Sequence, residues 1–438
     1  MLAVVVGAAS ALGAQALPPV RPLGPVIRVS PSDVLGSVSA VRPLPGGRVL
    51  VNDIVRRQLL LLDSTFATEG VIADTTAATA NAYSGRTAGM IPFRGDSTLF
   101  IDPTSLSMLV LDGAGKVARV MAVPRPNDAP FMIGGPFGTP GFDGKGRIVY
   151  RGFTRPNLPP PTAPGSPQGT LPRIPEQPDS APILRVALDT RALDTASFFK
   201  IPKTRVSMTQ NDRGQMSVSM MMNPMPVVDD WTLLSDGTLA VVRGADYHID
   251  WLAPDGARTS TPKIPFEWQR LTDEAKTAFV DSARTALEAQ RARTMNVGGA
   301  NVSVSGPAGG GPGGGDFTMM RVELGGGGPP RPAATAAGGA AAAPTLPPLS
   351  MVPITEIPDY RPAFGTSAVR ADLDGNLWIR TSKVANGGPV YDVVNRSGVL
   401  IDRVAFPFGR VIAGFGPGMI YMGVRDDKSA RLELARMR

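Results

Sequence analysis

The single histidine of the chain lies in the segment DYHIDW, residues 246–251. Side chains alternate between the two faces of a strand, so an extended segment would place Asp246, His248 and Asp250 on one face. Two carboxylates and one imidazole could bind a divalent metal ion, and a histidine beside an aspartate could act as an acid–base pair. Catalytic zinc sites generally use more than one histidine, so we favour a hydrogen-bonded strand pair with Trp251 packed between neighbouring sheets.

A second group of candidate residues stands where apolar strands of an internal repeat end. Guanidinium groups at such ends would suit a carboxylate, a phosphate or an acidic partner. The competing interpretation, which we favour, is that these residues form local ion pairs with aspartates and hold loops in place. The group consists of Asn52, Asp53, Asp102, Arg151, Arg243, Arg380 and Arg425.

Methionines are concentrated in residues 204–226, between two copies of the repeat. Thioethers are soft ligands and could hold copper(I). Copper proteins of that kind repeat short, regular methionine spacings, often with histidine, and this segment has neither. We therefore expect a flexible apolar loop or a contact surface. The methionines are Met208, Met216, Met220, Met221, Met222 and Met225.

The composition excludes several classes of function. The formal net charge of +7 comes mainly from scattered arginines, because only eight of the 44 basic residues are lysines. Nucleic-acid-binding proteins usually cluster their basic residues, and apart from the pair Arg56-Arg57 no basic run occurs, so we expect no nucleic-acid partner. The chain has no cysteine, which excludes disulfides, thiolate nucleophiles and cysteine-ligated metals.

The first residues predict export. A short apolar run at residues 2–12 precedes Ala14-Gln15-Ala16, a pattern suited to signal peptidase. We expect a signal peptide at 1–16, although no basic residue precedes the apolar run, and a mature chain of 17–438 that is periplasmic or secreted. The run is too short to span a bilayer, and no later segment is long and apolar enough to do so.

An internal repeat predicts the fold. Each copy has apolar strands joined by tight turns that contain glycine, often as Asp-Gly, which is the pattern of a four-stranded sheet. The sixth copy has only three strands, and residues 24–30 near the N-terminus supply one spare strand. We therefore predict an all-β fold, a six-bladed β-propeller of four-stranded antiparallel blades that the N-terminal strand closes. The copies cover residues 39–72, 89–123, 139–202, 229–265, 367–407 and 410–437.

The motif D-x-D-G-x-L-W-[VI] at residues 372–379, followed by VYDVVNRSG, resembles the six-bladed propellers of the NHL and TolB-like superfamily. The fourth repeat and the sequence IPFEWQRLTDEAKTAF resemble uncharacterised exported bacterial propellers. This resemblance implies the fold and no particular activity. Lactonase-type propellers hold calcium in the channel with Glu, Asn and Asp, and amidating-lyase propellers hold zinc with several histidines. One histidine does not fit the zinc site, whereas oxygen ligands for calcium could come from Asn52, Asp53, Asp102 and Asp229.

Long insertions interrupt the repeat, and all leave it at connections that emerge on one face of a propeller. They are a Pro-rich loop at 154–180, the Met-rich loop at 204–226, and a long segment with a helix at 266–293 and a Gly/Ala/Pro-rich, disordered part at 294–350. A small Gly insertion near Gly387 follows the same rule. Insertions gathered on one face indicate a binding face.

The inserted helix is expected over Thr272–Arg293, with Thr272 as its N-cap. Residues Leu271, Ala275, Phe279, Ala283 and Leu287 have helical spacing and would form its apolar face. This amphipathic helix should pack over the propeller.

These observations lead to an exported, monomeric binding or scaffold protein. Its insertion-bearing face would engage a protein, a peptide or a small anionic ligand. The alternative is a metal-assisted hydrolase or lactonase with a divalent cation, such as calcium, at the channel mouth. A third hypothesis is a structural protein in which the insertions have no function.

Overall fold

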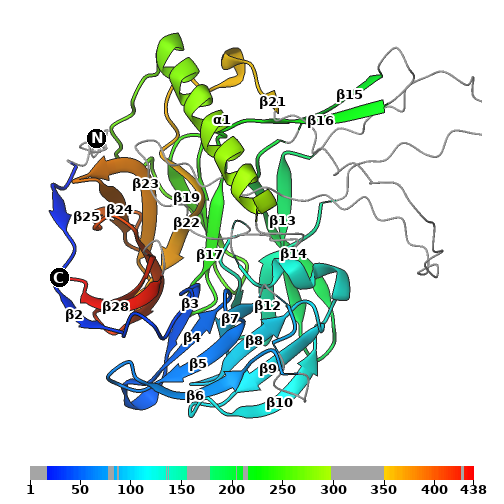
Figure 1. The fold of residues 1–438 in the computed structure, drawn as a ribbon, viewed down its shortest axis with the longest axis vertical. Coiled ribbons are helices and arrows are strands. Elements are labelled where there is room, and N and C mark those ends of the chain that lie inside the picture. The colour runs from blue at the N-terminus through cyan, green and yellow to red at the C-terminus, as the bar shows by residue number, and fades with distance from the viewer. Residues whose placement is uncertain are drawn as a thin grey trace, which may run out of the picture.

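The structure is a computed structural model that describes residues 17–76, 83–85, 88–134, 136, 138–154, 178–203, 205–210, 216–296, 350–425 and 429–438. Strands dominate these residues and form six small antiparallel sheets around a common centre (Figure 1). The chain is therefore a six-bladed β-propeller, as the repeat predicted.

The first three blades follow one another along the chain. The first contains β3 (Ala40–Pro43), β4 (Val49–Asp53), β5 (Gln58–Leu62) and β6 (Thr68–Ala73). The second contains β7 (Gly89–Pro92), β8 (Thr98–Asp102), β9 (Ser107–Leu111) and β10 (Val117–Ala122). The third contains β11 (Gly141–Phe142), β12 (Arg147–Arg151), β13 (Ser180–Ala187) and β14 (Leu193–Lys200).

In the last three blades, too, consecutive strands of the chain are neighbours in the sheet. The fourth contains β17 (Asp230–Leu233), β18 (Leu239–Arg243), β19 (His248–Leu252) and β20 (Arg258–Ser260). The fifth contains β22 (Phe364–Ala371), β23 (Leu377–Ala385), β24 (Gly388–Val394) and β25 (Leu400–Ala405). The sixth contains β26 (Arg410–Gly416), β27 (Met419–Arg425) and β28 (Ala430–Arg436), with β2 (Val26–Val29) as its fourth strand.

The N-terminal strand closes the ring, as predicted. Strand β2 pairs antiparallel with β28, and Val29 lies opposite Glu433. A second N-terminal strand, β1 (Val20–Pro22), was not predicted from the sequence. It pairs parallel with β25 and makes the fifth blade five-stranded. Both strands cover sheet edges that would otherwise be open to pairing with another chain.

The Asp-Gly turns that revealed the repeat have a common hydrogen-bonding pattern. In the turn between β22 and β23, Asp372 Oδ1 accepts hydrogen bonds from the backbone N–H groups of Asp374 at 3.0 Å and Asn376 at 2.8 Å. Gly375 has φ +81°, a conformation that side chains disfavour. The aspartate thus replaces backbone partners in a tight turn. The same pattern occurs at Asp63, Asp112 and Asp143.

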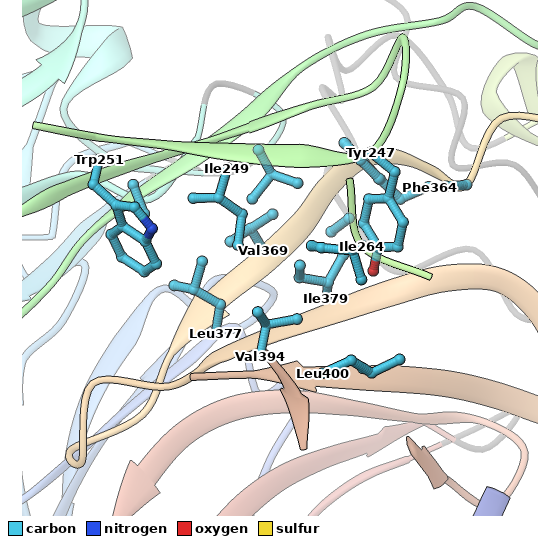
Figure 2. Close-up of a cluster of buried hydrophobic side chains, with 14 of the residues drawn as sticks. Tyr247, Ile249, Trp251, Ile264, Phe364, Val369, Leu377, Ile379, Val394 and Leu400 are labelled. Atoms are coloured by element: carbon cyan, nitrogen blue, oxygen red, sulfur yellow. The ribbon is translucent and has the colours of Figure 1, made fainter. Parts of the chain in front are cut away.

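The hydrophobic core is divided among the interfaces between blades. Six clusters of buried side chains each combine residues of two neighbouring blades, in sequence around the ring. Figure 2 shows the cluster between the fourth and fifth blades, where Tyr247, Ile249 and Trp251 meet Val369 and Leu377. The predicted packing of Trp251 between two blades is confirmed.

The insertions leave the propeller at the predicted connections. Residues 152–179 lie between β12 and β13, residues 201–229 between the third and fourth blades, and residues 261–363 between the fourth and fifth blades. In Figure 1 the inserted helix α1 (Asp273–Asn296) and the strands β15 (Arg205–Gln210) and β16 (Met216–Met222) lie at the same end of the propeller. We call this end the insertion-bearing face.

The Met-rich segment, which we expected to be a loop, contains a β-hairpin. Strands β15 and β16 pair antiparallel, and β21 (Ser350–Met351) pairs parallel with β16. The predicted signal peptide at 1–16, most of the Pro-rich loop and residues 297–349 of the low-complexity segment lie outside the described residues.

Helix α1 begins directly after the predicted N-cap, where Thr272 Oγ1 accepts a hydrogen bond of 3.2 Å from the N–H of Ala275. Its buried face differs from the prediction, because Ala275 is exposed and Lys276 is buried instead. The methylenes of Lys276 cover apolar surface, and its ammonium reaches Asp359 Oδ1 at 2.7 Å. The apolar face is thus one residue further along the helix at this end.

Helix α1 belongs to a small unit with its own core, which we call the cap. This core combines Met225, Val280, Val352 and Ile357, and none of its residues belongs to a blade strand. The 3-10 turn η3 (Ile354–Glu356) lies next to it. The cap is joined to the propeller by the stalk, residues 266–272 and 358–363. Its two segments run side by side, since the N–H of Leu271 donates to Asp359 O at 2.8 Å.

Candidate functional site

Two aspartates at the ends of second strands hold the segments that enter their own blades. Asp53 is fully buried, and its carboxylate accepts hydrogen bonds from Gly36 N at 2.7 Å and Ser37 Oγ at 2.9 Å. Asp102 is also buried and accepts from Ser84 N at 2.9 Å. Since both carboxylates bind backbone and hydroxyl donors of the protein, they stabilise connections on the insertion-bearing face.

Asn52, one residue earlier, joins the first two blades. Its Nδ2 donates to Ala88 O at 2.9 Å, and its Oδ1 accepts from Tyr83 Oη at 2.9 Å. Both hydrogen bonds are buried, so the side chain of Asn52 is used for packing between blades.

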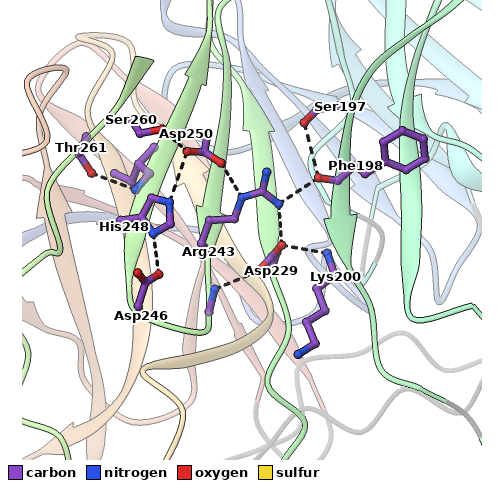
Figure 3. A network of polar contacts seen from close by, with 12 residues as sticks. Ser197, Phe198, Lys200, Asp229, Arg243, Asp246, His248, Asp250, Ser260 and Thr261 are labelled. Atoms are coloured by element: carbon purple, nitrogen blue, oxygen red, sulfur yellow. Dashed lines mark hydrogen bonds and ion pairs between the residues drawn. The ribbon is translucent and has the colours of Figure 1, made fainter. Parts of the chain in front are cut away.

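Arg243 is the last residue of β18 in the fourth blade and corresponds to Asp53 of β4 (Figure 3). At this strand end the side chain donates hydrogen bonds, whereas Asp53 accepts them. Its guanidinium donates to Asp229 Oδ2 at 2.8 Å and to Asp250 Oδ2 at 2.7 Å. Asp229 precedes β17 and also accepts from Gly244 N at 3.0 Å and Lys200 N at 2.9 Å. The local ion pairs that we favoured from the sequence are therefore present at Arg243.

The other arginines of this group differ in their surroundings. Arg151 is buried, its guanidinium carbon lies 5.4 Å from the centre of the Phe131 ring, and burial lowers its pKa to about 10. Arg380 is half-buried on β23, and Arg425 is exposed at the end of β27. The predicted group thus does not form one set of free side chains around a ligand.

The histidine segment forms a chain of polar contacts (Figure 3). His248 Nδ1 lies 2.6 Å from Asp246 Oδ1, and Nε2 lies 3.3 Å from Asp250 Oδ1. Asp250 also accepts from Ser260 Oγ at 2.5 Å. Strand β19 begins only at His248, because Tyr247 has φ +56° and ends a tight turn that also contains Asp246. His248 and Asp250 share a face as predicted, and Asp246 reaches the ring from the turn.

The cation sites predicted from sequence gain no support from this geometry. The part of the chain that the structure describes contains no group of three or more His, Asp or Glu side chains arranged to hold a metal ion. The ring nitrogens of His248 each face a carboxylate, and Arg243 and Ser260 occupy the oxygens of Asp250. The residues suggested as calcium ligands, Asn52, Asp53, Asp102 and Asp229, lie in or beside three different blades, and each already makes hydrogen bonds within the protein.

The inner strands of the third, fourth and fifth blades are joined by residues that the sequence did not single out. Arg370 Nη1 donates to Thr139 Oγ1 at 3.0 Å, and the N–H of Val369 donates to Asp230 Oδ2 at 2.8 Å. Asp230 is almost fully buried, and this burial raises its pKa to about 6. Its only signal in the sequence is the pair Asp229-Asp230 at the start of the fourth repeat.

A polar network with a buried centre at Tyr247, Asp392 and Arg403 lies where the stalk meets the fifth blade. Tyr247 Oη donates to Asp392 Oδ2 at 2.8 Å, and Arg403 Nε lies 3.5 Å from Asp392 Oδ1. Arg403 and Lys383 both reach Glu267 of the stalk, at 3.6 and 3.4 Å. Burial raises the pKa of Asp392 to about 6. The network ties the root of the stalk to β24 and β25.

Exposed aromatic side chains gather on the insertion-bearing face. Among the described residues, every exposed aromatic belongs to a connection on this face or to the strand end next to it, and the least exposed of them is 39% accessible. They are Phe153, Phe198, Trp268, Tyr360 and Phe408. We call them the aromatic set. Composition did not reveal this arrangement, because it depends on which connections reach the surface.

Comparisons with known proteins found distantly similar solved structures and no family or curated relative. A member of the DUF4221 family from Bacteroides vulgatus is 8% identical, with a TM-score of 0.45, over 93% of this chain and 95% of that one. An inactive variant of virginiamycin B lyase from Staphylococcus aureus is 10% identical, with a TM-score of 0.36, over 93% and 99%. A luciferin-regenerating enzyme is 10% identical, with a TM-score of 0.34, over 93% and 94%.

None of the helices that the structure describes combines the length and the hydropathy needed to cross a membrane.

Proposed function

We propose that this chain is an exported binding or scaffold propeller whose insertion-bearing face engages a protein or peptide partner. The aromatic set carries this proposal. Aromatic residues are enriched at the centres of protein interfaces, where their large surfaces leave water on binding. Scattered exposed apolar residues are ordinary, but confinement of every described exposed aromatic to one face is a feature of a binding surface.

The stalk presents part of this surface on a supported framework. Trp268 packs edge-to-face on Phe266, with ring centres 5.3 Å apart, and Phe266 packs in the same way on buried Tyr247 at 5.5 Å. Lys383 lies 5.6 Å from the centre of the Phe266 ring. Because this ladder of rings starts in the core, Trp268 can bury against a partner at little cost in conformational entropy.

The cations on this face favour an acidic partner. Arg425 is exposed, Lys263 is 73% exposed with its ammonium 3.7 Å from Asp246 Oδ2, and the whole chain carries a formal charge of +7. Rim charges of this kind mainly accelerate association and select partners by sign. We therefore propose acidic segments of a protein or peptide as the preferred partner class, with small anions as weaker ligands.

Export is the second part of the proposal, and it rests on the apolar run and the Ala-x-Ala pattern at 1–16. The propeller ring described above suits a chain that works outside the cytoplasm without disulfides, because closure removes open sheet edges. Fractionation of cells that express the full chain, with mass analysis of the mature N-terminus, tests both cleavage after Ala16 and the compartment.

Site-specific photo-crosslinking in the expressing cell tests the binding face. A photoreactive phenylalanine analogue at Phe198 or Phe408 should give the same discrete crosslinked product. The controls carry the analogue at Val71 on β6 and Val120 on β10, which are 47% and 45% exposed on outer strands. Products from the control positions alone, or from none of the four, would contradict the proposed face.

A further inference from the structure

A cavity of about 540 Å³ opens between the fifth and sixth blades. Its inner wall contains the turn that joins β22 to β23 and the turn that joins β26 to β27, and its outer wall contains β1 and the end of β28. These tight turns lie opposite the insertion-bearing face, so the site is independent of the function proposed above. The volume falls in the range of small-ligand sites, roughly 300–1,000 Å³.

Three charged groups of this cavity, Asp372, Arg21 and Asp402, are already paired within the protein. Asp372 accepts from the indole Nε1 of Trp378 at 3.0 Å and from Asn376 Nδ2 at 3.0 Å, besides the backbone of its turn. Arg21 of β1 donates to both carboxylate oxygens of Asp402, with Nη2 at 2.5 Å from Oδ2. These groups shape the walls and are satisfied without a ligand.

Three other charged side chains of the lining, Asp374, Arg436 and Arg438, are exposed and without such partners. The carboxylate of Asp374 stands in the turn of the fifth blade, and the guanidinium of Arg436 stands at the end of β28 in the sixth blade. None of the three side chains makes a hydrogen bond or an ion pair with any residue that the structure describes. A group that attracts cations and a group that attracts anions therefore belong to different blades around one cavity.

Between these charges the lining is apolar. Met419 and Ile401 contribute partly exposed surface, while Val393 and Trp378 are buried beneath. An apolar lining with a few polar groups that fix orientation is the usual composition of a small-molecule site. A ligand that suits this cavity has a positive end, a negative end and an apolar portion.

We propose that this cavity binds a small zwitterion, an apolar α-amino acid or dipeptide with free amino and carboxyl ends. Its ammonium group pairs with Asp374, and its carboxylate pairs with the planar fork of Arg436, which suits a carboxylate. Its apolar side chains lie over Met419 and Ile401. A singly charged ligand would use only one of the two groups.

The position of the cavity gives binding a structural consequence. Arg21 lies on the N-terminal strand β1. Arg436 lies on the last strand, β28, which pairs with the other N-terminal strand, β2. A ligand held between the fifth and sixth blades binds only the closed ring. It therefore raises the melting temperature, and above its Kd the rise grows with the logarithm of the ligand concentration.

Isothermal titration calorimetry of the mature protein tests the proposal with leucine and Leu-Leu as probes. N-acetylated and C-amidated Leu-Leu, which lack one charge each, should bind at least tenfold more weakly, since a hydrogen bond to a charged group contributes about 1.5–3 kcal/mol. Asp374→Asn should weaken Leu-Leu by a similar factor and leave the N-acetyl form unchanged. Arg436→Gln should weaken Leu-Leu by a similar factor, because it removes the partner of the carboxylate, and should leave binding of the C-amidated form unchanged.

Matched controls are available on other blades. Asp255→Asn changes an exposed carboxylate in a turn of the fourth blade, and Arg119→Gln changes an exposed guanidinium on β10. Both should bind Leu-Leu as the unmodified chain does. Absence of binding by leucine and Leu-Leu at millimolar concentration would overturn the proposal. So would binding that Asp374→Asn and Arg436→Gln leave unchanged, or that all four variants weaken equally.

Discussion

Tyr247 donates a hydrogen bond of 2.8 Å to Asp392, 145 residues away, and both side chains are buried between the fourth and fifth blades. Two other fully buried tyrosines make equivalent contacts, Tyr83 with Asn52 at 2.9 Å and Tyr150 with Asp128 at 2.9 Å. Each places a large apolar ring in an interface core and satisfies its hydroxyl on a polar acceptor. Buried tyrosines are thus one device that fixes how neighbouring blades sit.

Removal of one such hydroxyl should destabilise the propeller. Tyr247→Phe keeps the ring and leaves the carboxylate of Asp392 without its buried donor, so we expect the free energy of unfolding to fall by about 1–3 kcal/mol. Urea denaturation monitored by tryptophan fluorescence measures it. Tyr360→Phe, at a position that is 50% exposed, is the control and should change stability by less than about 0.5 kcal/mol. Equal effects of the two substitutions would refute the structural role of the Tyr247 hydroxyl.

Stability should depend on pH through Asp230. Burial raises its folded-state pKa to about 6, whereas an unfolded aspartate titrates near about 3.9. The folded state therefore holds the proton more tightly, and this contribution to stability is present below about pH 4 and lost as the pH rises to about 6. The difference corresponds to roughly 3 kcal/mol.

Asp230→Asn tests this dependence, because the amide oxygen can still accept from Val369 N and does not ionise. The stability of the variant relative to the unmodified chain should rise between pH 4 and pH 7, measured by urea denaturation at each pH. Ser32→Ala, an exposed substitution that removes no ionisable group, should give a difference that does not vary with pH. Parallel stability curves for Asp230→Asn and the unmodified chain would show that the carboxyl of Asp230 titrates normally.

Local sequence signals predicted the blades well. They could not predict contacts between residues that are far apart in the sequence. The Asp-Gly turns are visible in sequence because Asp372 bonds to the backbone within four residues. Asp230 and Asp392 look like ordinary surface residues, since their burial comes from partners 139 and 145 residues away. The strand predicted to include Asp246 begins only at His248, because Tyr247 has a left-handed backbone conformation at the end of a turn.

The same distinction explains the site residues. A position at the end of a second strand was recognisable in sequence, but its partner was not. Asp53 binds Ser37, whereas Arg243 binds Asp229, so the same place in two blades carries opposite charges with one structural role. The aromatic set was not predicted either, because exposure depends on the path of each connection over the face.

Ring closure should depend on Ser30, which is buried beside β28. Its Oγ accepts a hydrogen bond of 3.0 Å from the N–H of Leu432, and its own N–H donates to Leu432 O at 2.8 Å. Ser30→Ala leaves the Leu432 N–H without that acceptor, so we expect a loss of about 1–3 kcal/mol and faster amide exchange in β2 and β28. Ser32→Ala, at an exposed position, is the control. Unchanged exchange in both strands would contradict this account of closure.

The cap should unfold separately from the propeller, because its core contains no residue of a blade strand. Val280→Ala removes two methyl groups from that core, and we expect a local loss of roughly 1–3 kcal/mol. Amide exchange should then accelerate in α1, while the urea transition of the blades stays in place. Val242→Ala, in the core between the fourth and fifth blades, should shift that global transition instead. If Val280→Ala shifts the global transition as much as Val242→Ala does, the cap and the propeller form one cooperative unit. Trp268 would then owe its position to the whole fold rather than to the stalk alone.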